Sequence, residues 1–154
     1  MPVIRPAVPA DEAFLIALTA RLAEFDVPPW RTRAEIAGAD RDILLDALHR
    51  PSADTVILVA EEPAGTPAGC VFVSSKVDYF THASHAHVEV LAVDASVERR
   101  GVGRALLDAA ERWAVARGDA HITLNVFWQN RQARAVYDAL GYEPETIHYR
   151  KALE

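Results

Sequence analysis

Residues 98–107 read ERRGVGRALL, which combines two glycines, flanking arginines and an apolar run. The strand-like segment VEVLAVD precedes it, and an apolar stripe at helical spacing follows it. The first backbone N–H groups of a helix lack internal partners, and the helix macrodipole places about half a positive charge there. Glycine lets a phosphate approach such a backbone closely, and Arg99, Arg100 and Arg104 add positive charge. The pattern therefore predicts an anion site between a strand and a helix.

Two phosphate-binding motifs do not fit this glycine turn (residues 98–104). A P-loop needs lysine and then serine or threonine after its second glycine, where this chain has Arg104 and Ala105. The dinucleotide fingerprint needs a third glycine or alanine where Leu106 stands. The remaining interpretations are a different phosphate site and a tight strand-to-helix connection whose glycines only serve the turn.

The elements that must position this turn follow from hydrophobic periodicity and turn residues. Asp11 is the expected N-cap of a first helix, and TRAE at 32–35 has capping-box spacing. A hairpin that feeds a β-α-β unit indicates a mixed sheet with helices on both faces, an α/β (α+β) fold. Strands are expected at 3–7, 54–62, 70–80, 87–94, 121–128 and 146–153, and helices at 11–25, 40–50, 102–117 and 131–140.

Charge and cysteine content exclude several classes of function. The net charge is −6, which argues against nucleic acid as a partner. Residues 1–97 carry −7 and residues 98–154 carry +1, so the first part favours a cationic substrate and the second tolerates an anion. No apolar run approaches the roughly 20 residues of a membrane span, and no signal-peptide core is present, so we expect a cytoplasmic protein. The single cysteine, Cys70, is expected to be a buried strand residue rather than a catalytic thiol.

The glycine turn and its flanks resemble the central motif of the GNAT superfamily of N-acetyltransferases, which bind acetyl-coenzyme A. That motif is Gln/Arg-x-x-Gly-x-Gly/Ala, between a strand similar to VEVLAVD and a helix similar to GRALLDAAERWA. The resemblance is close from Val88 to Glu143 and implies a single N-acetyltransferase domain (1–154) with a GNAT-like fold, a cofactor motif at about 88–118 and a C-terminal signature at about 121–143. This second signature resembles NRQARAVYDALGYE and matches at Asn130, Ala133, Tyr137, Leu140, Gly141 and Tyr142.

The resemblance implies a site for acetyl-coenzyme A as co-substrate. Its diphosphate would rest on backbone N–H groups of the glycine turn. Its pantetheine arm would pair with the preceding strand, which carries a bulge in the family, and the N–H of Leu91 or Ala92 would polarise the thioester carbonyl. Glu98 stands where the family has Gln or Arg, and we expect Arg99 and Arg100 to offset its charge. The expected cofactor-binding residues are Leu91, Ala92, Val93, Arg99, Arg100, Gly101, Val102, Gly103, Arg104, Asn130, Ala133 and Tyr137.

Tyr137 and Asn130 each have two interpretations. They lie seven residues apart, nearly two helical turns, so both face one side of a helix. By the resemblance, Tyr137 is the general acid that protonates the departing thiolate, whose pKa resembles the ~8.5 of cysteine. Without the motif, Tyr137 packs in a core stripe. Asn130 is a favoured N-cap, which is compatible with a hydrogen bond to the cofactor.

Glu89 is the expected general base and the second catalytic residue. Free alkyl amines titrate near ~10.4, so the amine must lose a proton before it attacks. Side chains alternate along a strand, which places Glu89 on the side of His87, Leu91 and Val93. A carboxylate within HVEVLAV is unusual for a core strand, and the family often has an acid here. The alternatives are a solvent-facing or ion-paired Glu89, with a histidine or water as the base.

Three histidines, His82, His85 and His87, form a cluster in HASHAH. His85 and His87 would share a strand face, but no Cys, Asp or Glu completes the ligand set at close spacing, so we expect no metal ion. An ordinary polar loop is favoured over a substrate-lining or proton-relay role.

Together these residues predict an N-acetyltransferase that moves an acetyl group from acetyl-coenzyme A to a primary amine of a small molecule by direct attack in a ternary complex. The alternatives are a non-catalytic acyl-coenzyme A binding module or sensor and a protein N-terminal or lysine acetyltransferase. The small amine is the expected partner, with no nucleic acid and no membrane, and a homodimer is left open.

Overall fold

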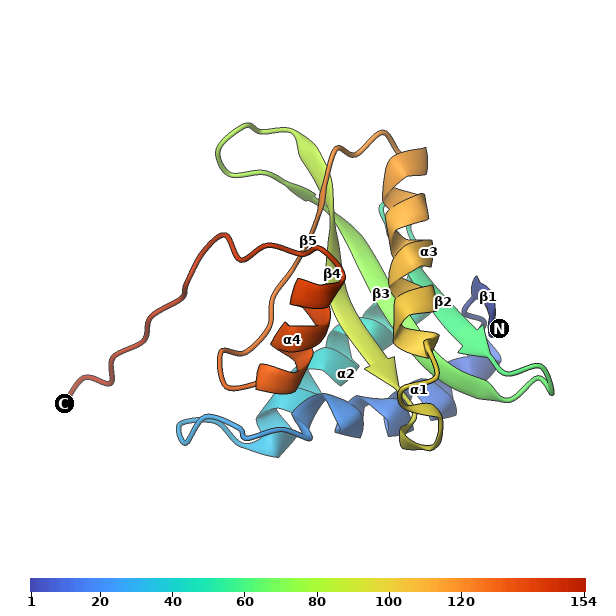
Figure 1. Cartoon of the computed structure of the whole chain (residues 1–154), viewed down its shortest axis with the longest axis horizontal. Helices are drawn as coiled ribbons and strands as arrows, with labels where there is room; N and C mark the ends of the chain where they lie inside the picture. The colour runs from blue at the N-terminus through green and yellow to red at the C-terminus, as the bar shows by residue number, and fades with distance from the viewer.

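A five-stranded sheet forms the centre of the protein (Figure 1). The computed structural model describes residues 1–154. The first three strand pairings are antiparallel and the last is parallel, which confirms the predicted mixed sheet and makes it mostly antiparallel. In spatial order, which is also chain order, the strands are β1 (Val3–Pro6), β2 (Thr55–Glu61), β3 (Pro67–Val77), β4 (Ser84–Val93) and β5 (Ile122–Leu124).

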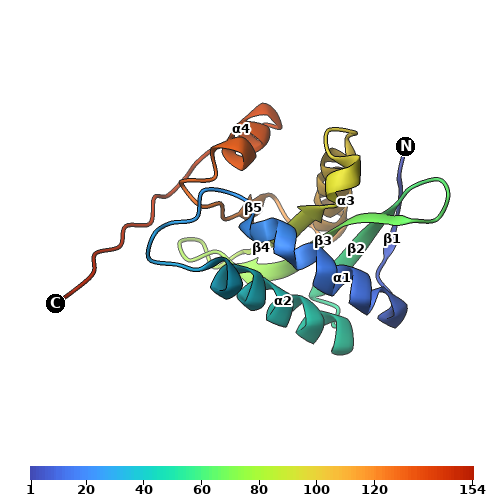
Figure 2. The same ribbon diagram turned by 90° about the horizontal axis from the view of Figure 1, so that it is seen from below.

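Helices cover both faces of the sheet, as predicted. Figure 2 shows α1 and α2 on one face and α3 and α4 on the other. None of them combines the length and the apolar character that crossing a membrane requires. The helices are α1 (Glu12–Thr19), α2 (Arg33–His49), α3 (Val102–Ala116) and α4 (Arg131–Ala139), with short 3-10 helices at Pro9–Asp11, Ala20–Ala23 and Ala95–Val97.

Alternating side chains of β3 divide the core into two clusters. Val71 and Val73 pack toward α3, where Leu106 is fully buried. Cys70 and Phe72 pack toward α1 and α2 on the opposite face. Burial raises the pKa of the Cys70 thiol to about 12, so the cysteine is the buried strand residue that the sequence predicts.

The predicted strand at 146–153 is wrong, because these residues have no regular secondary structure and are exposed. A strand needs a neighbouring edge to satisfy its N–H and C=O groups, and β5 is only 3 residues long instead of the predicted 121–128. Figure 1 shows the chain after α4 leading away from the sheet.

The first two helices also differ from expectation. The carboxylate of Asp11 precedes α1 but does not cap it, because it accepts two hydrogen bonds of 2.8 Å from Arg5. By contrast, Thr32 caps α2 as predicted, accepting from the N–H of Glu35 at 3.0 Å. This cap starts α2 at Arg33, several residues before the predicted start.

Candidate active site

The glycine turn joins β4 to α3 and leaves a group of backbone donors free. Gly101 has φ +81° and Arg99 has φ +62°, so the chain passes through two left-handed residues before α3 begins. No acceptor within the chain bonds the backbone N–H groups of Arg99, Gly101, Val102, Gly103 and Arg104. Donors concentrated at a helix start are suited to an anion, which agrees with the predicted anion site.

Two glycines near this turn have different reasons to be glycine. A Cβ on Gly69 of β3 would lie 2.9 Å from the carbonyl oxygen of Ala92, so close packing of β3, β4 and α3 requires glycine there. A Cβ on Gly103 would lie 3.6 Å from Val93, an ordinary contact, and the φ of Gly103 is not positive. Neither packing nor backbone conformation requires glycine at 103, and its missing side chain leaves the backbone donors accessible.

Glu98, the residue that departs from the family motif, is paired with Arg21. The expected partners, Arg99 and Arg100, form no ion pair with it. Arg21 also pairs with Glu24 and donates from Nε to the carbonyl oxygen of Val93 at 3.1 Å. A guanidinium from the 3-10 turn after α1 therefore neutralises the acid of the glycine turn, a contact across 77 positions of the sequence.

A bulge in β4 creates an open strand edge beside the turn. Phe72 pairs with Val90 and the next residue, Val73, pairs with Val88, so Glu89 is the extra residue. β5 pairs with β4 only from Ala86 to Val88. Beyond the bulge, residues 89–93 have β3 on one side and no strand on the other. This edge, which includes the predicted cofactor-binding residues 91–93, leads directly into the glycine turn.

The bulge also changes which side chains share a face, so the prediction for Glu89 is confirmed for His87, which pairs with Ser74, but wrong for Leu91 and Val93. Leu91 and Val93 pack against the core cluster on the α3 side of the sheet. Val90 and Ala92 belong to the cluster on the side of α1 and α2. Glu89 lies on this second side, where its carboxylate contacts the β3 residues described next. A single inserted residue in the ladder breaks the simple alternation on which the prediction rested.

The carboxylate of Glu89 is held by two neighbours from β3. Ser74 Oγ donates to Oε1 at 2.6 Å, and Lys76 Nζ lies 2.8 Å from the same oxygen. Burial alone would raise the pKa of Glu89, but Lys76 and Ser74 together hold it below its ordinary value. Burial lowers the pKa of His87. The pKa of Asp40 in α2 is raised, mainly by burial and also by the negative charge of Glu89. The site thus holds a carboxylate that is already ion-paired, as one of the alternatives expected.

Helix α4 supplies Asn130 and Tyr137. Asn130 caps the helix as predicted, with its Oδ1 accepting from the N–H of Ala133 at 3.2 Å. The Tyr137 ring packs at the edge of the α3 cluster, 5.8 Å from the ring of Tyr142, and burial raises its pKa. The hydroxyl of Tyr142 donates to Glu111 at 3.0 Å, whereas no partner within the chain binds the hydroxyl of Tyr137. Tyr137 is therefore both packed and free to donate.

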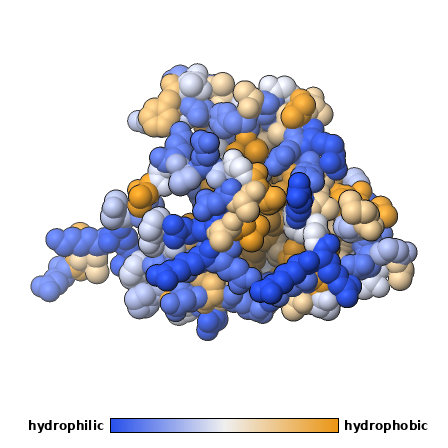
Figure 3. Space-filling view, viewed as in Figure 1, coloured by the Kyte–Doolittle hydropathy of each residue, from blue (hydrophilic) through white to orange (hydrophobic).

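The surface between α3 and α4 is hollowed and partly apolar. Figure 3 shows apolar residues gathered in this hollow, with hydrophilic residues around it.

The three histidines of the HASHAH segment, His82, His85 and His87, lie elsewhere and do not point toward one another. His82 is an exposed loop residue, and His87 Nδ1 lies 2.7 Å from Thr123 Oγ1.

Sequence reasoning missed Arg21, Ser74, Lys76 and Asp40. Each acts through a partner far away in the sequence, and no local spacing pattern signals such a contact. A predicted register for the β3–β4 hairpin is the signal that could have indicated Ser74 and Lys76 as neighbours of Glu89.

Comparisons with known proteins agree with this geometry. Residues 17–142 match the model of the acetyltransferase (GNAT) family. Mycothiol acetyltransferase of Beutenbergia cavernae is 39% identical over 66 residues, which cover 43% of this chain but only 22% of that relative. The uncharacterized N-acetyltransferase YhfO of Bacillus subtilis is 29% identical over 153 residues, covering 95% of this chain and 94% of the relative.

Solved structures share the fold over the whole chain. The aminoglycoside 6'-N-acetyltransferase AAC(6')-Ih of Acinetobacter baumannii has a TM-score of 0.73 at 16% identity and covers 100% of both chains. AAC(6')-Iy, in complex with the bisubstrate analog CoA-S-monomethyl-acetylneamine, has a TM-score of 0.70 at 23% identity and covers 99% of both chains. Since the family model matches most of its length, the chain belongs to the GNAT family and is an N-acetyltransferase.

Proposed function

We propose that this enzyme transfers an acetyl group from acetyl-coenzyme A to a primary amine of a small molecule, by direct attack in a ternary complex. The observation that carries the proposal is the continuity of two backbone surfaces, the free donors of the glycine turn and the edge of β4 that no strand covers. A diphosphate suits the first surface, and an arm containing amide groups suits the second. The solved complex of AAC(6')-Iy with a coenzyme A-linked aminoglycoside analog supports this assignment.

In the proposed complex the backbone does most of the cofactor binding. The N–H groups of residues 99–104 bind the diphosphate, and residues 91–93 pair with the pantetheine arm. Of the two expected donors, Leu91 and Ala92, the N–H of Leu91 polarises the thioester carbonyl, because Asp94 and therefore Ala92 direct their N–H groups toward β3. Asn130 and Ala133 complete the cofactor site from α4. Strands from residue 3 to residue 124 share one sheet, which supports one N-acetyltransferase domain over residues 1–154.

Tyr137 is the proposed general acid. Its raised pKa keeps the hydroxyl protonated at neutral pH, and the hydroxyl has no competing partner within the chain. Because a thiol near ~8.5 is a stronger acid than this phenol, full proton transfer to the thiolate is uphill, and Tyr137 stabilises the departing thiolate first by donating a hydrogen bond.

Glu89 is the proposed acceptor-side residue, and its environment indicates how it acts. An alkylammonium near pKa ~10.4 would lose its proton only uphill to a carboxylate whose pKa is lowered. We therefore infer that Glu89 attracts the ammonium ion and accepts its proton through water. Asp40 on α2 adds a second carboxyl group near Glu89, which favours a cationic acceptor.

A thiol-release assay with acetyl-coenzyme A and a panel of amines tests the function. We expect small cationic amines to release free thiol. Tyr137→Phe should lower turnover about 100-fold or more with unchanged coenzyme A affinity by calorimetry. Tyr142→Phe is the matched control, because it removes the neighbouring hydroxyl and only its bond to Glu111.

Three results would contradict the proposal. Binding of acetyl-coenzyme A without thiol release from any amine would indicate a binding module. Release only with peptides that carry a free N-terminus or a lysine would indicate a protein acetyltransferase. Equal turnover in both tyrosine variants would remove the role of Tyr137.

A further inference from the structure

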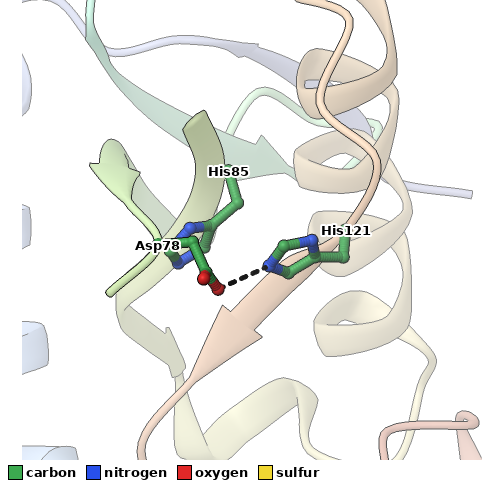
Figure 4. A group of neighbouring side chains, drawn as sticks. All are labelled: Asp78, His85 and His121. Carbon is green, nitrogen blue, oxygen red and sulfur yellow. Dashed lines mark ion pairs between the residues drawn. The ribbon is translucent and has the colours of Figure 1, made fainter. Parts of the chain in front are cut away.

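The structure brings together a group of ligand-type side chains that the proposed reaction does not use (Figure 4). Asp78 follows β3, His85 lies in β4 and His121 immediately precedes β5. One ligand atom from each of the three residues lies within 4.8 Å of the others. The group lies at the Ser84 end of β4, opposite the end that leads into the glycine turn.

His85 has no partner that explains its burial. It is 8% exposed, and its Nδ1 is buried without a hydrogen bond. Its ring stacks on that of His121 at a centroid distance of 4.7 Å. A buried polar atom without a partner costs free energy, and an ion is one of the groups that can satisfy it.

The loop holds Asp78 in a position to bind a cation. Its Oδ1 accepts from the N–H groups of Phe80 and Thr81 at 2.9 and 2.8 Å. Its Oδ2 is turned the other way and lies 3.9 Å from Nε2 of His121. Hydrogen bonds that orient a carboxylate are typical of ligands with a supporting outer shell. Asp119, whose Oδ2 is also buried without a partner, adds a further negative charge in the segment before His121.

We propose that Asp78, His85 and His121 bind a divalent transition-metal ion of the zinc type. Two imidazole nitrogens and one carboxylate oxygen form a ligand set that such ions accept, with a remaining position for water. Tetrahedral Zn²⁺ with bonds of about 2.0–2.1 Å places its ligand atoms ~3.3 Å apart, so the ligand atoms, now within 4.8 Å, close by up to about 1.5 Å on binding. The stacked rings of His85 and His121 turn so that their in-plane nitrogen lone pairs converge on the ion.

The bound ion has a structural role, and the inference does not rest on the proposed function. β5 pairs with β4 over only three positions, Ala86 to Val88. The ion ties the start of β5 to the β3–β4 hairpin and so strengthens this short parallel pairing. The expectation of a metal-free protein considered only residues closely spaced in the sequence, whereas this set comes from three separate segments.

Titration of the tag-free, chelator-treated protein with ZnCl2 tests the site. Calorimetry should give one ion per chain, and Zn²⁺ should raise the thermal unfolding midpoint. His121→Ala should weaken binding by more than the roughly 10- to 100-fold typical of outer-shell changes, and it should abolish the thermal shift. Asp78→Asn should do the same while keeping an oxygen for the loop N–H groups. Circular dichroism checks that both variants fold.

His82→Asn is the matched control, because it removes an exposed imidazole from the same loop and tolerates the left-handed backbone there. It should bind Zn²⁺ like the wild type. Co²⁺ substitution should give visible absorption bands in the wild type and not in His121→Ala. The proposal is wrong if the wild type binds no Zn²⁺, if both ligand variants bind it unchanged, or if His82→Asn weakens it equally.

Discussion

The two ends of β4 present different chemical groups, backbone groups at one end and ionisable side chains at the other. At the Val93 end, the open edge and the glycine turn offer backbone groups, beside the Arg21–Glu98 ion pair. At the Ser84 end and up to the bulge, the strand carries ionisable side chains with partners in β3 and β5. A backbone site depends on the path of the chain and on small residues. A side-chain site depends on long-range contacts, so single substitutions should affect the two ends differently.

The largest effect is expected at the side-chain end. Glu89→Gln keeps the size of the residue and an oxygen for Ser74, but it removes the negative charge. Turnover should fall about 10²- to 10⁴-fold, because the amine loses its proton-accepting group. Coenzyme A affinity, measured by calorimetry, should not change. An equal loss of affinity would mean that the two ends are not separate sites.

A smaller effect is expected from a charge introduced at the backbone end. Gly103→Asp should weaken coenzyme A binding roughly 100-fold by repelling the diphosphate, while an acid in the first helical turn leaves stability intact. Ala34→Asp is the matched control, because residue 34 is the second residue of α2, as 103 is of α3. If both variants bind coenzyme A normally, the glycine turn is only a connection between strand and helix.

Lys76→Met tests how the side-chain end is tuned. Without the ammonium group, the pKa of Glu89 rises from its lowered value, so Glu89 becomes protonated at higher pH. The acidic limb of the pH–rate profile should therefore move to higher pH. Because Lys76 is half exposed, the extra loss of activity near about pH 5 should be only a few-fold. An unchanged pH–rate profile would mean that Glu89 takes no part in the rate-limiting proton transfer.

The smallest effect is expected from Arg104→Ala. The guanidinium is exposed and screened, so its loss should weaken coenzyme A binding by about 5-fold or less, with greater loss at low salt. Titrations at two salt concentrations measure this effect. A loss larger than that of Gly103→Asp would show that side chains, rather than the backbone, bind the diphosphate.

Local patterns predicted the parts of the molecule that local physics determines. The cap at Asn130, the helix that starts after Gly101 and the buried strand around Cys70 depend on neighbouring residues. The Arg21–Glu98 pair depends on how α1 packs beside the turn, which no spacing reveals. Glu89 was wrongly placed on the face of Leu91 and Val93, because the bulge lies in the pairing of two strands and not in either strand alone. The strand predicted at 146–153 had suitable residues but no edge to join.

Because Cys70 is buried, the folded protein does not react with disulfide reagents, since that reaction needs an accessible thiolate. Such a reagent can therefore follow release of coenzyme A without a background from the enzyme. With no coenzyme A present, the same reagent labels Cys70 only when β3 separates from α1 and α2. The labelling rate then measures how often the centre of the sheet opens.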